Sequence, residues 1–302
     1  MKLAPIVLFV YNRPEHLRQT IESLKLNDLA SESELFIYSD GPKNEADASK
    51  IFEVREYIKK IQGFKDLVIV EKENNAGLAK SVITGVGAVL ERFGKIIVLE
   101  DDLAVSPYFL DYMNTALSIY ENADQVMQIS GFMFPVKFRN VSKDCFFLPF
   151  TTTWGWGTWT RAWRHFDNTM KGYEKLRVNK ELRRSFDMRG TYPYFEMLER
   201  QMRGEVNSWG IQWYLSVFIN NGIVLHPRIS LSKNIGFDKH ATHTRMNEGY
   251  SRGPVLNVRI RHYPENAEID AAATDDYLRF FGEPKSVMGK IMQRLLPTRH
   301  KQ

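Results

Sequence analysis

The stretch Lys95-Ile-Ile-Val-Leu-Glu100-Asp101-Asp102 decides the fold prediction for this chain. Its four consecutive apolar residues, most of them β-branched, are typical of a strand buried on both faces of a sheet, and three carboxylates follow directly. Adjacent carboxylates repel one another unless water or a cation lies among them. Two interpretations are open from these residues alone: a solvated turn after a strand, or a divalent-metal site at one edge of a sheet.

The length and composition indicate an ordinary globular protein. The chain has 302 residues, of which 43% are apolar and 25% charged. These proportions exclude disordered and fibrous classes. Because the length exceeds that of most single cores, we expect one main domain followed by a C-terminal extension.

Cysteine usage and hydropathy indicate a cytoplasmic protein. Cys145 is the only cysteine, which excludes an intrachain disulfide and a cysteine-based zinc site. The first apolar run, from Ile6 to Tyr11, is too short for a signal-peptide core or a membrane span. No other stretch is long enough to cross a bilayer.

The positive charge is concentrated at the C-terminus. The net charge is +5, and residues 285–302 contain five Lys or Arg residues and no acidic residue. The rest of the chain therefore carries 36 basic and 36 acidic residues. This distribution argues against a broad nucleic-acid-binding face and for a local basic segment.

Strand and helix patterns alternate through the first hundred residues. Short apolar runs predict strands at 6–11, 34–39, 67–71 and 95–99, and helical spacing predicts helices at 14–24, 46–61 and 79–93. Strands separated by single helices specify a parallel, doubly wound sheet that binds ligands at the carboxyl ends of its strands. The fold class is therefore α/β.

Polar residues follow these strands and should gather at one rim of the sheet. Arg13, Asp40, Asn74 and the acidic motif at 100–102 all lie just past strand ends. The dinucleotide fingerprint G-x-G-x-x-G is absent after the first strand. An arginine near metal-binding carboxylates instead indicates a nucleoside diphosphate, whose charge both groups can share.

The order of these motifs resembles the nucleotide-binding half of a GT-A fold glycosyltransferase. Tyr11-Asn-Arg-Pro14, Ser39-Asp-Gly41, Asn75-x-Gly77 and Leu99-Glu-Asp-Asp102 follow one another in the same order as in N-acetylglucosaminyltransferase I and its bacterial relatives. That family uses Glu-Asp-Asp as its version of the DxD metal motif. The resemblance covers roughly residues 4–245. It places the nucleotide-binding half at about 1–105 and the acceptor half at about 106–245.

The resemblance implies a nucleotide-sugar site. Asp40 would contact the base, and Arg13 would lie near the diphosphate. Asn75 and Gly77 would belong to the same nucleotide-sugar-binding site. The implied donor is a nucleoside-diphosphate sugar, with UDP as the expected nucleotide.

The resemblance also implies a metal. Asp102 would bind Mn²⁺ or Mg²⁺, while Glu100 and Asp101 would orient the sugar and ribose. Relatives place a histidine on the metal from the region around 240, which favours His243. An ordinary loop histidine is equally compatible with that position.

The segment at 146–159 ends in alternating tryptophan and glycine. Glycine lets the backbone approach a ligand closely, and indoles supply flat apolar walls for a sugar. The segment resembles the Gly-Trp loop that closes over the donor sugar in the named family, which assigns Trp156 and Gly157 to the donor site. The alternative is an aromatic core cluster.

The general base is the point where this chain departs from the family. The family has an aspartate beside a tryptophan at about Trp209, but here Gly210 and Gln212 stand in its place, and neither accepts a proton. The nearest carboxylate is Glu205, which we take as the candidate base. Asp238 is the next candidate.

The C-terminal extension, residues 246–302, ends in an apolar stripe at helical spacing. The stripe comprises Val287, Met288, Ile291, Met292, Leu295 and Leu296. Basic residues lie near it, so the predicted amphipathic helix either contacts an anionic membrane surface peripherally or docks onto protein.

Together the motifs predict a metal-dependent hexosyl- or N-acetylhexosaminyltransferase. It would transfer a sugar from the donor to a hydroxyl of a glycan or lipid-linked glycan, with inversion if the base takes the family position. Two alternatives stay open: a nucleotidyltransferase, and a catalytically inactive carbohydrate-binding protein of the same fold.

Overall fold

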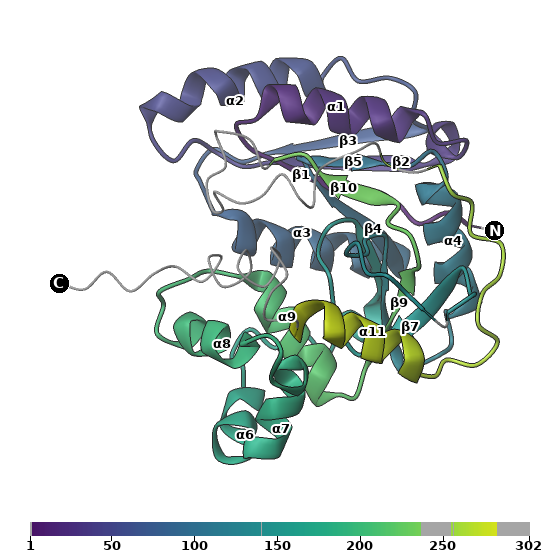
Figure 1. Cartoon of the computed structure of the whole chain (residues 1–302). Coiled ribbons are helices and arrows are strands. Elements are labelled where there is room, and N and C mark those ends of the chain that lie inside the picture. Colours follow the sequence, from purple (N-terminus) through teal and green to yellow (C-terminus); the bar gives the residue numbers. More distant parts are fainter. Residues whose placement is uncertain (1, 140, 237–254, 256, 283–302) are drawn as a thin grey trace.

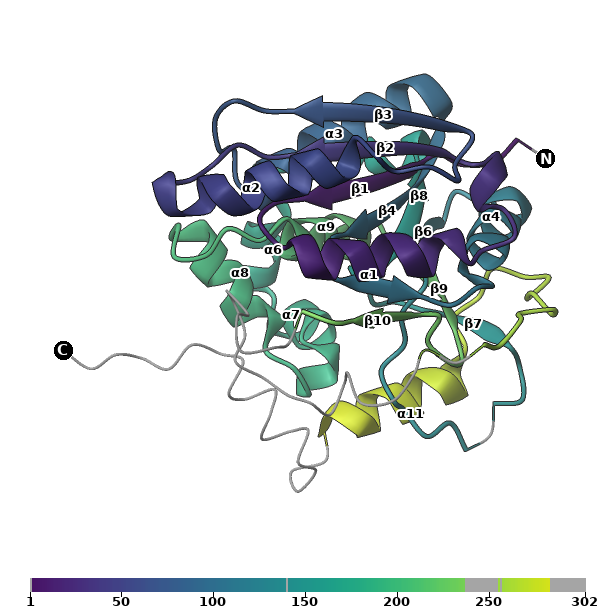
Figure 2. The same cartoon turned by 90° about the horizontal axis from the view of Figure 1, so that it is seen from above.

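The computed structural model describes residues 2–139, 141–236, 255 and 257–282. An eight-stranded sheet crosses the molecule and carries helices on both faces (Figures 1 and 2). This confirms the α/β prediction.

The first hundred residues alternate strand and helix. The elements are β1 (Ile6–Val10), α1 (Pro14–Lys25), the 3-10 turn η1 (Ala30–Glu32), β2 (Glu34–Ser39), α2 (Glu45–Ile58), β3 (Asp66–Glu71), α3 (Leu78–Phe93) and β4 (Lys95–Glu100). Local chemistry sets several boundaries: Pro14 starts α1, the Asn44 side chain caps α2, and Gly94 ends α3 in the left-handed conformation at φ 80°.

The second half is less regular. Its strands are β5 (Leu103–Val105), β6 (Val126–Ser130), β7 (Cys145–Leu148), β8 (Trp156–Trp159), β9 (Ile223–Pro227) and β10 (Ser232–Asn234). Its helices are α4 (Phe109–Ile119), α5 (Thr160–Trp163), α6 (Gly172–Val178), α7 (Lys180–Phe186), η2 (Met188–Gly190), α8 (Tyr194–Met202), α9 (Trp209–Ile219) and α11 (Ala271–Gly282).

The sheet has a parallel part and a mixed part. The strand order is β3-β2-β1-β4-β8-β6-β9-β7, and β3, β2, β1 and β4 all run in parallel. β8 runs antiparallel to both of its neighbours, β4 and β6. A separate two-stranded sheet pairs β10 with β5.

The tryptophan-glycine segment forms strand β8 in the middle of the sheet, which corrects the prediction of a loop there. Trp156 is 1% exposed and stacks on Trp209 with ring centroids 5.1 Å apart. Gly157 is required because a Cβ there would lie 2.9 Å from the carbonyl oxygen of Ile96 on β4. The alternation of tryptophan and glycine thus serves close strand packing, as in the core-cluster alternative.

Each face of the sheet carries its own apolar core because side chains alternate along the strands. Ile6, Leu8 and Val10 of β1 pack with α1 and α4 on one face. Val7 and Phe9 pack with α3 and α9 on the other. A third cluster joins β7 to the helices α6–α9 and to α11.

The segment 257–282 is fastened along the outer edge of the sheet. Ile269 forms a parallel bridge with Phe147 of the edge strand β7, and the Tyr120 hydroxyl donates to the carbonyl of Pro264 at 2.7 Å. At α11, Asp276 accepts hydrogen bonds from the backbone and guanidinium of Arg139 and from Arg279. An otherwise open sheet edge is thereby covered.

Several sequence predictions lie outside the described residues. These are His243, Asp238 and the amphipathic helix at 285–302. Among the helices that the structure does describe, none is long and apolar enough to cross a membrane.

Asp276→Ala should destabilise the protein by about 2–4 kcal/mol. The side chain is 6% exposed and accepts several charge-assisted hydrogen bonds, each worth about 1.5–3 kcal/mol but not additive. Urea denaturation of both proteins measures the difference in free energy of unfolding.

The adjacent Asp275→Ala is the matched control. Asp275 makes a solvent-exposed ion pair with Arg189, so its loss should cost less than about 1 kcal/mol. Equal effects of the two substitutions would show that α11 is not anchored through Asp276.

Candidate active site

A cavity of about 850 Å³ opens at the carboxyl ends of the parallel strands. One wall carries the strand-end residues that the sequence singled out. It includes Arg13, Asp40, Asn75, Gly77, Glu100, Asp101 and Asp102. The structure therefore brings seven of the predicted site residues to one place.

The pairing of β1 with β4 sets the centre of this wall. Phe9 lies opposite Glu100 in the parallel register, so the residues that follow the two strands are neighbours. The Tyr11 N–H donates to Asp101 Oδ2 at 3.0 Å, and Arg13 Nη1 donates to Asp102 Oδ2 at 2.6 Å. The contact between arginine and acidic motif is thus a direct consequence of strand order.

The clustered carboxylates perturb one another. Burial, followed by repulsion from Asp102 and Asp101, raises the pKa of Glu100 to about 8. Burial, followed by repulsion from Asp102, raises the pKa of Asp101 to about 7, while Arg13 and the Tyr11 N–H act in the opposite direction. Burial and repulsion thus favour the protonated forms of Glu100 and Asp101, and Arg13 favours the ionised forms.

One carboxylate oxygen of Asp102 is available to a ligand. Its Oδ2 pairs with Arg13, but its Oδ1 is buried and has no hydrogen-bond partner in the described part of the chain. A buried carboxylate oxygen normally has a partner. Among the described residues no group of three or more His, Cys, Asp or Glu is arranged to hold an ion.

The chain after β10 closes over Asp102. The Ile235 N–H donates to the Asp102 carbonyl at 2.8 Å, and the Gly236 N–H donates to Asn234 Oδ1. A Cβ on Gly236 would overlap Asp102 Oδ2, so a larger residue there would displace the Asp102 carboxylate. Gly236 is not among the residues predicted for the site, because nothing near it in the sequence shows that it faces the acidic motif.

Asp40 anchors the loop before α3. Its two oxygens accept hydrogen bonds from the backbone N–H groups of Gly41, Ala76 and Gly77 at 2.8–3.1 Å, and the Asn75 side chain donates to the Gly41 carbonyl at 2.9 Å. Both carboxylate oxygens are therefore engaged within the protein. A contact of Asp40 with the base stays a prediction.

The first turn of α2 and the loop before it add residues that were not predicted for the site. Asp47 accepts from the Tyr11 hydroxyl at 2.8 Å and from Asn12 Nδ2 at 2.7 Å, and the Lys43 N–H donates to the Tyr11 oxygen at 3.0 Å. Asp47 looks like a helix-start residue in the sequence, and only the tertiary structure shows that it faces the first loop.

The opposite wall is aromatic and hydroxylic. It is formed by Phe132, Phe134, Thr151–Trp154, Tyr192, Tyr194, Met197, Ser208, Gly210, Ile211 and Tyr214. Trp156 and Gly157, predicted to bind the donor, are not on the cavity surface. The preceding residues 151–154 do line the cavity, because the chain enters the sheet between Trp154 and Trp156.

Buried hydrogen bonds fix this wall from behind. Gln128 Nε2 donates to the Thr152 carbonyl at 2.7 Å, and Gln128 Oε1 accepts from Trp213 Nε1 at 2.7 Å. His226 contacts the carbonyls of Phe132 and Phe150, and burial lowers its pKa to about 4. The imidazole is therefore neutral at neutral pH, and its single N–H donates to only one of the two carbonyls.

Glu205 is not brought to the cavity. It lies on an exposed turn after α8 and forms ion pairs with Arg203 at 2.5 Å and Arg200 at 3.4 Å. The hydrogen bond from Arg203 is the main cause that lowers its pKa. Gly210, where the family aspartate was sought, does line the cavity. Glu205 as the base stays a prediction without geometric support.

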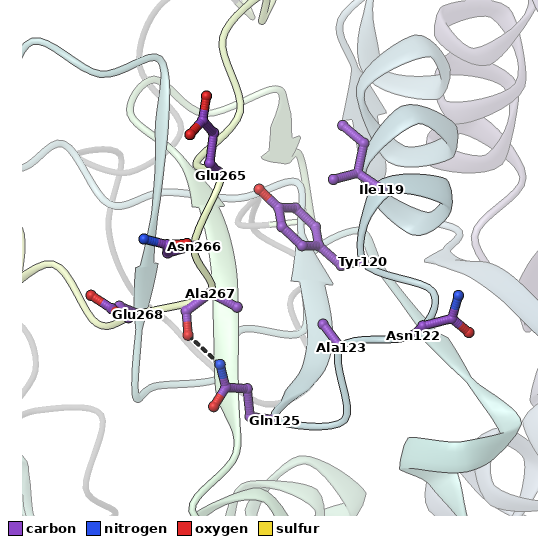
Figure 3. A pocket seen from close by; sticks show the side chains of 9 residues that line it. All are labelled: Ile119, Tyr120, Asn122, Ala123, Gln125, Glu265, Asn266, Ala267 and Glu268. Carbon is purple, nitrogen blue, oxygen red and sulfur yellow. Dashed lines mark hydrogen bonds between the residues drawn. The ribbon is translucent and has the colours of Figure 1, made fainter.

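A second cavity, of about 390 Å³, lies away from the strand ends (Figure 3). It lies between the α4–β6 connection and residues 265–268 of the segment 257–282. Gln125 Nε2 donates across it to the Ala267 carbonyl at 2.5 Å. Its two carboxylates, Glu265 and Glu268, are exposed and point apart, so it offers no convergent polar site.

The parallel sheet, the acidic motif after β4 and the adjoining arginine define a GT-A type glycosyltransferase fold. The family model described as "GNT-I family" matches residues 1–168. The chain therefore belongs to the GNT-I family, as the motif order predicted. No curated protein sequence matches significantly.

The chain is also similar to solved structures at low sequence identity. TarS 1–349 of S. aureus is 12% identical, with a TM-score of 0.42, and the match covers 77% of this chain and 61% of that one. The mannosyltransferase PcManGT from Pyrobaculum calidifontis, in complex with GDP-Man and Mn²⁺, is 12% identical, with a TM-score of 0.36 and coverages of 52% and 44%. The galactosyltransferase LgtC is 10% identical, with a TM-score of 0.34 and coverages of 58% and 65%.

Asp40→Ala should loosen the loop at 74–77. Amide hydrogen exchange at Ala76 and Gly77 should become at least about tenfold faster, because each amide loses its buried acceptor. Asp47→Ala is the control: its carboxylate accepts from Tyr11 and Asn12 but from neither of these amides.

Nucleotide binding separates the anchoring role from a base contact. A loop anchor predicts that Asp40→Ala weakens UDP and GDP by the same factor. A loss confined to UDP, measured by calorimetry, would instead support direct contact between Asp40 and the base.

Proposed function

We propose that this protein transfers a sugar from a nucleoside-diphosphate sugar, with UDP as the expected nucleotide, to a hydroxyl of a glycan or lipid-linked glycan. The observation that carries the proposal is the pairing of Arg13 with one oxygen of Asp102, while the other, buried oxygen has no hydrogen-bond partner among the described residues. Family membership supports sugar transfer, and we assign the reaction to the cavity at the strand ends.

The charged wall supplies donor binding. Arg13 directly precedes α1 and pairs with Asp102 at the strand ends, and in this proposal it would contact the diphosphate. The loop that Asp40 anchors, with Asn75 and Gly77, would border the nucleoside, together with Tyr11 and Asp47. Glu100 and Asp101 would face ribose and sugar hydroxyls.

Asp102 would hold a divalent cation, Mn²⁺ or Mg²⁺, together with the donor phosphates. Such an ion stabilises the charge that develops on the leaving diphosphate. Arg13 would contribute to the same stabilisation through the guanidinium that now pairs with Asp102. His243 is a further proposed ligand from outside the described residues.

The uncharged wall would hold the acceptor. A carboxylate is needed there for an inverting displacement, since the acceptor hydroxyl must lose a proton as it attacks. In the described part of the chain this wall carries none. Inversion and Glu205 as the base therefore remain predictions, and NMR of the product's anomeric proton would test them.

A donor panel tests the function directly. Release of nucleoside diphosphate should be observed from at least one UDP-hexose or UDP-N-acetylhexosamine with Mn²⁺ and should fall to background in EDTA. UTP as the only substrate would indicate a nucleotidyltransferase. Binding of UDP without release from any donor, with or without glycan acceptors, would indicate a binding protein and contradict the proposal.

Asp102→Asn should abolish the effect of metal on UDP affinity. In wild type, UDP should bind at least about tenfold more tightly with Mn²⁺ than in EDTA, and the variant should bring this ratio close to one. In EDTA the variant should bind UDP at least as well as wild type, because a negative charge next to the diphosphate has been removed. Calorimetry measures both affinities.

Two further variants serve as controls for Asp102. Asp111→Ala removes a surface carboxylate that pairs with Arg259, so both UDP affinities should remain unchanged. Arg13→Ala should weaken UDP binding with and without metal, because it removes the guanidinium that would contact the diphosphate. An unchanged metal effect in Asp102→Asn would place the ion elsewhere.

A further inference from the structure

Three residues connect the first strand to the first helix. Tyr11, Asn12 and Arg13 follow β1, and Pro14 starts α1. The Tyr11 N–H donates to Asp101 Oδ2 at 3.0 Å, and the N–H of residue 17 donates to the Arg13 carbonyl at 3.0 Å. The acidic motif and the first turn of α1 therefore hold the backbone of this connection at its two ends.

Asp47 holds the same connection from a third direction. Its Oδ2 accepts from the Tyr11 hydroxyl at 2.8 Å, and its Oδ1 accepts from Asn12 Nδ2 at 2.7 Å. Each oxygen of one carboxylate thus binds one of two consecutive side chains. Hydrogen bonds to an ionised carboxylate are stronger than those between neutral groups.

Asp47 is itself fixed by helix α2. It lies in the first turn, where its backbone N–H donates to Oδ1 of the cap residue Asn44 at 3.1 Å. A carboxylate is favoured at this end of a helix because of the free backbone N–H groups there. Helices α1 and α2 lie side by side on one face of the sheet (Figures 1 and 2), and Leu17 and Val54 belong to the same buried cluster. Asp47 therefore projects from an element that is packed on the core.

The contacts of Asp47 have a consequence for Arg13. Arg13 directly follows the two residues that Asp47 binds, and its Nη1 donates to Asp102 Oδ2 at 2.6 Å. In enzyme sites, a displacement of about 1 Å can lower a rate about 10²-fold. The position of the Arg13 guanidinium at the strand ends thus depends on where Asp47 holds the connection.

We propose that Asp47 is a positioning residue of the donor site, which holds Tyr11 and Asn12 so that the Arg13 guanidinium is presented to the donor diphosphate beside Asp102. The inference rests on the proposed function, in which Arg13 contacts the diphosphate. Asp47 acts through the connection and not through a contact of its own with the phosphates, since a carboxylate repels them.

Substitutions at Asp47 test this role through UDP affinity in saturating Mn²⁺, measured by calorimetry. Asp47→Ala should weaken UDP binding at least about tenfold, because both side-chain hydrogen bonds are lost. Asp47→Asn removes the charge but keeps an oxygen that accepts from Asn12, so it should weaken UDP binding less than about threefold. A loss below about threefold in Asp47→Ala, or an equal loss in both variants, overturns the proposal.

Glu45→Ala is the matched control. Glu45 is an exposed carboxylate in the same first turn of α2 and lies outside the set of residues that line the cavity. Its removal changes the charge of this turn by the same amount, so UDP affinity should stay within about twofold. Urea midpoints confirm that each variant is folded. An equal loss of affinity in Glu45→Ala and Asp47→Ala would contradict the positioning role.

A double substitution separates positioning from a general structural effect. In the Arg13→Ala background, Asp47→Ala should change UDP affinity less than about twofold, because the guanidinium that Asp47 positions is gone. The effects of independent sites on binding free energy add, whereas those of coupled residues do not. A further tenfold loss in the double variant would show that Asp47 acts independently of Arg13 and would overturn the proposal.

Tyr11→Phe takes the place of Asp47→Ala in this cycle if that variant does not fold. It removes the hydrogen bond to Asp47 Oδ2 and keeps the ring. UDP affinity should fall about threefold in the wild-type background and remain unchanged in Arg13→Ala. Equal losses in the two backgrounds would overturn the proposal.

The outcome is separable from that of the proposed function. If wild type binds UDP in Mn²⁺ and Asp47→Ala binds it equally well, the positioning role fails and the transferase proposal stands. If wild type does not bind UDP, the proposed function fails, and the positioning role, which rests on it, fails with it.

Discussion

The parallel pairing of β1 with β4 is the constraint on which the site depends. Register places Phe9 opposite Glu100, so the loop after β1 meets the acidic motif that ends β4. The Tyr11 N–H and the Arg13 guanidinium then bind Asp101 and Asp102. These carboxylates would repel one another in an isolated turn. Here they are held side by side because the sheet core lies beneath them and the Arg13 guanidinium lies beside them.

The rest of the cavity follows from how β8 enters the sheet. β8 inserts antiparallel between β4 and β6, which carries Trp156 into the core and leaves Trp154 at the surface of the cavity. Hydrogen bonds from Gln128 and the contacts of neutral His226 fix the segments on either side. The parallel part of the sheet thus provides the charged wall, and the mixed part provides the aromatic wall.

The segment 257–282 supports both the edge of the sheet and the aromatic wall. It bridges to the edge strand at Ile269, and its helix packs behind Phe134 and Tyr192. Loss of the Arg139–Asp276 contact would therefore act on both stability and the aromatic wall. Edge protection and site construction are two results of one packing arrangement.

The sequence by itself determined the strands and helices of the first hundred residues and the grouping of Arg13 with the acidic motif. Local periodicity specifies the strands and helices, and a parallel sheet presents the carboxyl ends of its strands at one edge, which groups Arg13 with the acidic motif although they lie far apart in the chain. Three outcomes depended on tertiary structure. Gly157 became part of a central strand because it permits close approach to Ile96 of β4, a long-range contact that a tryptophan-glycine pattern does not reveal. The Asp40 carboxylate turned inward to three backbone amides, and Tyr192 and Tyr194 reached the cavity only because α8, α9 and α11 pack together there. Side-chain contacts across such distances depend on how elements pack, which no local pattern in the sequence encodes.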